Sequence, residues 1–108
     1  MATSRRKWRV AISDRLRLDN QITYQDGIPT RYSLNLCGLI KGEWESLARY
    51  DNAHGSSHKH IAHPYRSPDV HPFLAVIVDT YLEAALTDLT ANASEYLDEF
   101  ERELGERE

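Results

Sequence analysis

A chain of 108 residues with a net charge of −4 has room for one domain, and we expect residues 1–108 to fold as a single domain. Two tryptophans and six tyrosines argue against disorder, and the single Cys37, expected to pack inside a strand, excludes an internal disulfide. No apolar run approaches the roughly 20 residues that cross a bilayer, and the basic start lacks the apolar segment of a secretory signal. We therefore expect a cytoplasmic protein without a membrane segment.

Residues 7–18 alternate between apolar and polar side chains, which predicts a half-buried strand with a basic outer face. The apolar positions are Trp8, Val10, Ile12, Leu16 and Leu18, and the basic ones are Lys7, Arg9, Arg15 and Arg17. Asp14 interrupts the apolar set, so we expect a bulge or bend near Ser13 and Asp14. Asp19-Asn20 then predicts a turn, followed by a short strand over residues 21–25.

Two tight-turn signals organise the middle of the chain. Asp26-Gly27 predicts a two-residue hairpin, and Lys41-Gly42 predicts a second tight turn. Between them, alternation over residues 31–40 predicts a long central strand, with Pro29 at its start, where a missing N–H is tolerated.

Alternation continues after the second turn, over residues 43–50, and predicts a strand with Trp44, Ala48 and Tyr50 on one face. A loop over residues 51–57 and a short strand over residues 58–63 follow. We therefore expect a basic β-meander over residues 7–63, joined by a connecting loop over residues 64–72 to the rest of the chain.

The apolar spacing changes to three and four after this loop, which predicts an acidic C-terminal helix over residues 73–104 that Gly105 ends. A single helix of this length would measure roughly 45 Å, longer than a domain of this size is wide. Either it breaks near residues 87–94, where Thr, Asn and Ser lower helix propensity, or its far half packs on a second copy. We expect a homodimer through this helix, because its apolar stripe extends from Leu82 to Leu104.

Because the predicted strands come first in the chain and the predicted helix comes last, we expect an α+β fold. It would be an antiparallel β-meander of four or five strands followed by one long, or broken, C-terminal helix packed on one face. If the polar positions of neighbouring strands lie on the same side of the sheet, the face not covered by the helix carries five arginines: Arg9, Arg15, Arg17, Arg31 and Arg49. Such a face suits a polyanion, whereas the acidic end of the chain repels one. The alternative is that both charged ends are solvated faces, or attract each other within a dimer.

All five histidines lie between residues 54 and 71, and most belong to the segment Arg49–His60. Imidazoles beside a guanidinium and a carboxylate are sufficient for metal-free RNA cleavage, because they can take and give protons while the cation stabilises the phosphorane. The candidate catalytic residues are Arg49, Asp51, His54, His58 and His60, and the candidate nucleic-acid-binding residues are Arg9, Arg15, Arg17, Arg31 and Lys59.

Two other interpretations of this segment stay open. His54, His58, His60 and His63 with Asp51 offer ligands for a metal, but Arg49 and Lys59 would repel a divalent cation, and we predict none. Alternatively, the segment is a turn capped by Asp51 and Asn52 with surface histidines. No Gly-rich phosphate loop is present, and we predict no cofactor.

Residues 22–63 resemble the TumE-type family of toxin–antitoxin modules, through four short stretches. These are Arg31-Tyr32-Ser33-Leu34-Asn35-Leu36, Gly42-Glu43-Trp44, Arg49-Tyr50-Asp51-Asn52-Ala53-His54 and His58-Lys59-His60. The chain also resembles a related family of small uncharacterised proteins with the pattern Arg-Tyr-Asp-x-Ala-His-Gly-x-x-His. The resemblance implies a toxin-like protein with a cognate antitoxin as partner, acting on RNA.

We therefore expect a small protein of toxin–antitoxin type that engages RNA through Arg49–His60, with metal-free RNA cleavage as its candidate activity. The alternative is a non-enzymatic protein-interaction module, such as an antitoxin, a phage or plasmid accessory protein, or a helix-mediated dimer.

Overall fold

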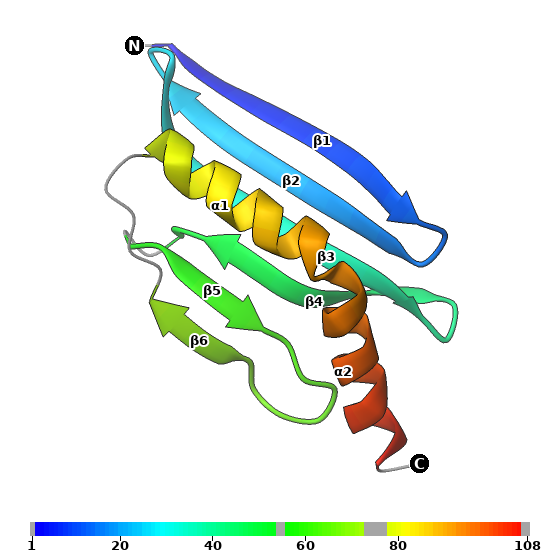
Figure 1. The fold of residues 1–108 in the computed structure, drawn as a ribbon. Coiled ribbons are helices and arrows are strands. Elements are labelled where there is room, and N and C mark those ends of the chain that lie inside the picture. The colour runs from blue at the N-terminus through cyan, green and yellow to red at the C-terminus, as the bar shows by residue number, and fades with distance from the viewer. Residues whose placement is uncertain (1, 54–55, 73–77, 107–108) are drawn as a thin grey trace.

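The computed structural model describes residues 2–53, 56–72 and 78–106. The protein folds as an antiparallel sheet with two helices on one face (Figure 1). The six strands neighbour one another in chain order, as in a simple meander. They are β1 (Thr3–Ser13), β2 (Leu16–Gln25), β3 (Ile28–Ile40), β4 (Glu43–Asp51), β5 (His58–Ile61) and β6 (Asp69–Pro72), followed by α1 (Val78–Ala91) and α2 (Ala93–Gly105). The expected α+β fold with an antiparallel sheet is thus confirmed, but the strand count of four or five is wrong.

Both predicted tight turns are present at the two ends of β3. Asp26 and Gly27 have φ values of 50° and 79°, and Lys41 and Gly42 have values of 51° and 82°. Positive φ at both central residues is the geometry whose twist matches that of the flanking strands. Glycine at the second position reaches it without a steric cost, so the two hairpins fix the register of β2, β3 and β4.

The first hairpin differs from the sequence prediction, because its turn lies at Asp14–Arg15 and not at Asp19–Asn20. Asp19 and Asn20 lie inside β2, and Asn20 is buried. The register pairs even residues of β1 with even residues of β2, such as Val10 with Leu18. The apolar alternation therefore passes through the turn unchanged, and periodicity could not reveal it. The predicted bulge is confirmed as a register shift between Ala11 and Ser13.

The segment 64–72, predicted as a connecting loop, contains β6. This strand pairs antiparallel with β5, from Ile61 opposite Asp69 to His58 opposite Pro72. A four-residue strand with one exposed valine carries too little alternation to be recognised in the sequence. Its proline is tolerated because β6 is at the edge of the sheet.

The C-terminal helical segment breaks at Asn92, within the predicted range, so it forms two helices and not one long helix. Both helices bury apolar side chains against the same face of the sheet: Ala85 and Leu89 from α1, and Ala93, Leu97 and Phe100 from α2. One chain therefore covers much of the stripe that suggested a dimer. Association of two copies stays a prediction.

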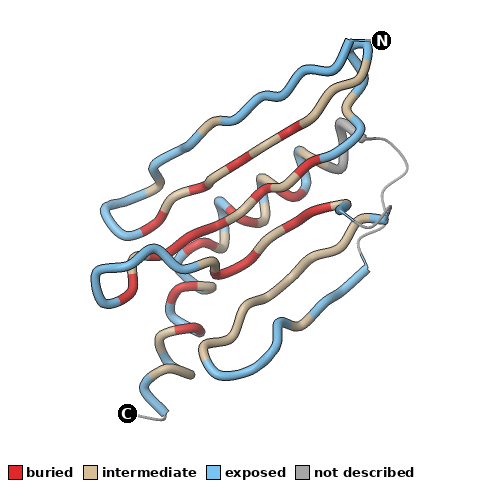
Figure 2. Tube along the Cα trace, turned by 180° about the vertical axis from the view of Figure 1, so that it is seen from behind, coloured by how far each residue is buried: buried red, intermediate tan, exposed pale blue. Residues whose placement is uncertain are grey.

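The core lies between the helices and strands β2, β3 and β4, where the buried residues in Figure 2 concentrate. A register shift in the β3–β4 pair makes Leu47 a bulge residue, so that Leu47 and Ala48 are both buried. The bulge also turns Trp44 away from the core. Trp44 is 38% exposed, and the guanidinium of Arg17 lies 4.1 Å from the centroid of its ring. The prediction that Trp44 shares a face with Ala48 is therefore wrong.

Candidate nucleic-acid interface

The face of the sheet opposite the helices, here called the open face, carries polar side chains in rows that cross the strands. The register defines two long rows. One contains Lys7, Gln21, Ser33, Asp51 and His58; the next contains Arg9, Asp19, Asn35, Arg49 and His60. Residues two apart on a strand share a face, so both rows lie on the same side. Four of the candidate catalytic residues thus meet on adjacent positions of β4 and β5.

Cations outnumber carboxylates on the open face, although the whole chain has a net charge of −4. Register places six cationic side chains there: Arg5, Lys7, Arg9, Arg17, Arg31 and Arg49. The carboxylates in the same rows are Asp19 and Asp51. The predicted basic face is therefore present, with Arg9, Arg17, Arg31 and Arg49 in it.

Asp51 is the centre of the candidate catalytic group and is only 6% exposed. Its Oδ2 lies 2.7 Å from Nε of Arg49 and 3.5 Å from Nε2 of His60, and its Oδ1 accepts a hydrogen bond of 3.4 Å from the Ala53 N–H. A buried carboxylate needs such compensation for its lost hydration. The Asp51 carboxylate thus lies within ion-pair distance of both the guanidinium and the imidazole at the end of β4.

His58 has its ring orientation set by the backbone. Its Nδ1 lies 3.1 Å from the carbonyl oxygen of Ser56, which can only accept, so Nδ1 carries the proton and the neutral ring keeps a lone pair on Nε2. The rings of His58 and His60 lie edge to face with their centroids 6.4 Å apart. The two imidazoles therefore have different partners although they share one face.

Asn52 anchors this end of the sheet, a role that sequence reasoning missed. Its side chain accepts a hydrogen bond from the Tyr32 N–H at 2.9 Å and donates one to the Thr30 carbonyl at 3.0 Å. It thus continues the β3–β4 ladder where the backbone of β4 leaves it. An asparagine directly after a strand is the signal that was available.

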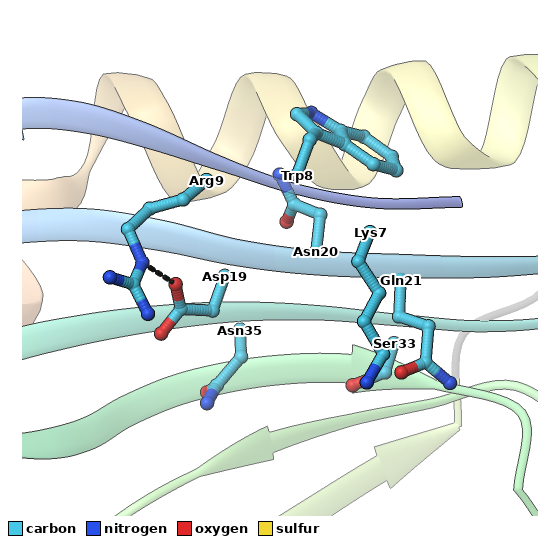
Figure 3. A pocket seen from close by; sticks show the side chains of 8 residues that line it. All are labelled: Lys7, Trp8, Arg9, Asp19, Asn20, Gln21, Ser33 and Asn35. Carbon is cyan, nitrogen blue, oxygen red and sulfur yellow. Dashed lines mark hydrogen bonds and ion pairs between the residues drawn. The ribbon is translucent and has the colours of Figure 1, made fainter. Parts of the chain in front are cut away.

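Two hollows lie on the sheet around this group. One, of about 310 Å³, is lined by Gln21, Arg31, Tyr32, Ser33, Arg49, Asp51 and Ala53. The other, of about 700 Å³, extends toward β1 and is lined by Lys7, Trp8, Arg9, Asp19, Asn20, Gln21, Ser33 and Asn35. Figure 3 shows that Trp8 and Asn20 point toward the helices, whereas Lys7, Arg9, Asp19 and Gln21 point to the open face. Because both hollows include Gln21 and Ser33, they adjoin and form one trough from β1 to β4.

The cations of the open face differ in how far they are neutralised. Asp19 holds Arg9 at 2.6 Å and Arg17 at 3.3 Å, and Asp51 holds Arg49. Arg5, Lys7 and Arg31 form no ion pair with any other residue in the described part of the chain. Of these three, Lys7 and Arg31 line the trough, so they are the cations most available there to an external anion.

Three candidate residues are not in this group. Arg15 lies in the β1–β2 turn, where its guanidinium donates to the Leu39 carbonyl and pairs with Glu101 of α2 at 3.0 Å, so its predicted place on the open face is wrong. Lys59 points to the opposite face, with Nζ 3.0 Å from Asp88, because neighbouring residues of a strand alternate. His54 lies outside the described residues.

The metal alternative gains no support from the geometry that can be seen. Within residues 2–53, 56–72 and 78–106, no three His, Cys, Asp or Glu side chains are grouped as a metal site would need. His63, a proposed ligand, instead lies between Asp69 and Glu103 near α2. No helix in the described ranges is long and apolar enough to span a membrane.

Comparison with known proteins concerns nearly the whole chain. A family model described as a domain of unknown function, DUF7718, matches residues 1–106. The chain belongs to this family. The DUF7718 match includes both the open face and the two helices, so the site and its support are parts of one family domain. No curated protein and no solved structure matches the chain.

Proposed function

We propose that this protein binds single-stranded RNA across the open face of its sheet. The observation that carries the proposal is the hollow in which the exposed Arg31 meets Arg49, continuous with a trough that reaches Lys7. Guanidinium groups bind phosphate oxygens in bidentate fashion, and neutralising phosphates supplies most of the affinity for a nucleic acid. Cations spaced over β1, β3 and β4, namely Lys7, Arg31 and Arg49, suit successive phosphates of one strand.

Single-stranded RNA fits this surface better than a duplex. The open face is a sheet surface, and the helices lie on its other side, so they cannot enter a groove from it (Figure 1). Sheet surfaces that bind RNA accept unpaired bases laid over the strands. Gln21, Ser33 and Asn35 supply hydrogen-bonding groups in the middle of the trough for such bases.

Cleavage of the bound RNA is the second candidate function, favoured by the two imidazoles beside Arg49. The Nε2 lone pair of His58 would take the proton from a 2′-hydroxyl as its oxygen attacks phosphorus, while protonated His60 would give a proton to the departing 5′-oxygen. The new P–O2′ bond replaces the P–O5′ bond, leaving a cyclic phosphate and a 5′-hydroxyl. Arg49 would stabilise the phosphorane charge.

Binding is tested by fluorescence anisotropy with a labelled single-stranded RNA oligonucleotide at several salt concentrations. Arg31→Ala and Arg49→Ala are each expected to weaken binding about tenfold, corresponding to roughly 1.4 kcal/mol, and to reduce the salt slope by about one contact. Arg102→Ala removes the same charge from α2 and serves as the matched control. Equal losses in all three variants, or tighter binding to duplex RNA, would contradict the proposal.

Cleavage is tested on the same RNA in the presence of a chelator. A cyclic-phosphate product that disappears in both His58→Asn and His60→Asn, while binding persists, is the expected result. A product that needs added zinc or manganese would rule out the metal-free route. If cleavage occurs, induced expression should slow growth, as the resemblance to toxins implies, and either histidine variant should remove this effect.

A further inference from the structure

Strand β1 forms a long edge of the sheet that differs from the opposite edge. It has eleven residues, and all but Trp8 and Ile12 are exposed. The other edge, β6, has only four residues and ends in Pro72. In Figure 2 the exposed colour follows β1 over most of its length, whereas buried residues alternate along β2. An edge of this length is a template on which a further strand can pair.

The outward backbone groups of β1 can be assigned from its pairing. The carbonyl of Ala2 accepts a hydrogen bond from the Asp26 N–H at 2.8 Å, so even-numbered residues direct their backbone toward β2. Alternation then directs the N–H and C=O groups of Arg5, Lys7 and Arg9 outward. These outward groups lie on the same residues whose side chains occupy the open face.

The charge of this edge selects what can pair with it. β1 contains Arg5, Arg6, Lys7 and Arg9 and no acidic residue. A second copy pairing antiparallel about Lys7 would place Lys7 against Lys7 and Arg5 against Arg9, and like charges directly opposite are destabilising. An acidic strand would instead find a cation opposite it at every second position.

Apolar surface is available on the other side of the same strand. Val10 is 42% exposed, and Trp8 and Ile12 are partly buried at the rim of the core, with the guanidinium of Arg6 lying 4.6 Å from the Trp8 ring. A strand added next to β1 would place every second side chain beside these residues. The edge therefore accepts alternating acidic and apolar side chains.

We propose that the β1 edge binds an extended acidic segment of a partner protein, which adds to the sheet as a seventh strand. Its backbone pairs with the outward groups of Arg5, Lys7 and Arg9, its acidic side chains lie beside those cations, and its apolar side chains lie beside Trp8 and Val10. This proposal does not require RNA binding, because it needs the backbone of the edge and not the Arg31–Arg49 hollow, although both proposals use the side chains of Lys7 and Arg9.

The probe is a nine-residue peptide in which glutamate alternates with valine, compared with one in which lysine replaces glutamate. Hydrogen exchange measured by NMR is expected to show the glutamate peptide slowing the Arg5, Lys7 and Arg9 amides, with no effect from the lysine peptide. Lys7→Ala and Lys7→Pro both remove the charge, but only proline removes the outward N–H. We expect Lys7→Ala to weaken peptide binding about tenfold and Lys7→Pro to abolish it.

Circular dichroism of both variants checks that the protein remains folded, and the RNA affinities of the two variants, compared with each other, serve as an internal reference. Equal RNA affinity in the two variants with unequal peptide binding supports the proposal, whether or not RNA binds. Equal peptide binding in both variants, equal binding of both peptides, no binding, or protection away from β1 would each overturn it.

Discussion

His63 is buried between α2 and β6, with its side chain 5% exposed and each ring nitrogen facing a carboxylate. Nδ1 lies 2.7 Å from Glu103 and Nε2 lies 2.9 Å from Asp69. Burial lowers the pKa of the imidazole, but hydrogen bonds to the two carboxylates outweigh it and raise the pKa above its ordinary value. The two carboxylates therefore favour the cationic form of His63, which in that form is a charged clamp between α2 and β6, away from the candidate catalytic group.

Replacing His63 tests the clamp through its pH dependence. A folded-state pKa above the unfolded one means that the charged clamp stabilises the fold fully below pH ~6.5 and loses this effect as the pH rises through the raised pKa. We expect His63→Gln to lower the midpoint of urea unfolding at pH 5.5 and to change it little at pH 9. An equal loss at both pH values would show that packing, and not charge, is what His63 contributes.

At the scale of elements, α2 packs closely on β3 because Gly38 has no side chain. A Cβ at this position would lie 2.8 Å from Cδ1 of Leu47 and 3.0 Å from Cδ1 of Leu97. Leu47 is buried through the β4 bulge, and Leu97 comes from the buried face of α2. The bulge, the glycine and the helix therefore fit together as one packing arrangement.

The substitution Gly38→Ala tests this arrangement. Overpacking a well-filled core costs about 1–3 kcal/mol, and we expect a loss in that range in the free energy of unfolding measured with urea. Gly105→Ala is the matched control, because nothing lies within 4 Å of the added methyl group, and its effect should stay within about 0.5 kcal/mol. A loss of the same size in both variants would contradict this packing.

The whole molecule measures 51 × 27 × 21 Å and has two unlike faces. The open face is basic, and the helical side carries the acidic end of the chain. The helices are joined to the sheet by the apolar core and by Asp88 of α1. Its carboxylate accepts hydrogen bonds of 2.7 Å from Tyr50, Tyr96 and Asn92 and lies 3.0 Å from Nζ of Lys59. Four elements and the α1–α2 junction thus meet at one carboxylate.

Acid unfolding tests this junction. Burial raises the pKa of Asp88, but the hydrogen bonds from Tyr96, Tyr50 and Asn92 outweigh burial and lower the pKa to about 2. The folded pKa is depressed, so the stabilisation is present above pH ~4 and lost as the pH falls toward ~2, a change of about 2 kcal/mol. Asp88→Asn should remove this loss and lower stability at pH 7. Asp98→Asn, on the exposed side of α2, should leave the acid transition as in the wild type.

Periodicity and turn chemistry in the sequence determined the local structure. Asp26-Gly27 and Lys41-Gly42 predicted two hairpins because few residues accept positive φ in both turn positions. The change of apolar spacing predicted the helical segment and the region of its break. The alternation of side chains along each strand likewise predicted that one face carries Arg9, Arg17, Arg31 and Arg49, and the register confirms this.

Tertiary structure alone decided the features that depend on register between strands. The sequence did not reveal the first turn, because even residues pair with even residues across it and the apolar alternation continues unchanged. The extra residue Leu47 in β4 placed the side chain of Trp44 on the opposite face from the predicted one. The meeting of Asp51 with Arg49 and His60, and of Arg31 with Arg49 in one hollow, depends on which residues lie opposite one another. The predicted turns fix the register only where the strands run without a bulge, so the positions of the bulges, and the contacts that depend on them, follow from packing in the folded chain.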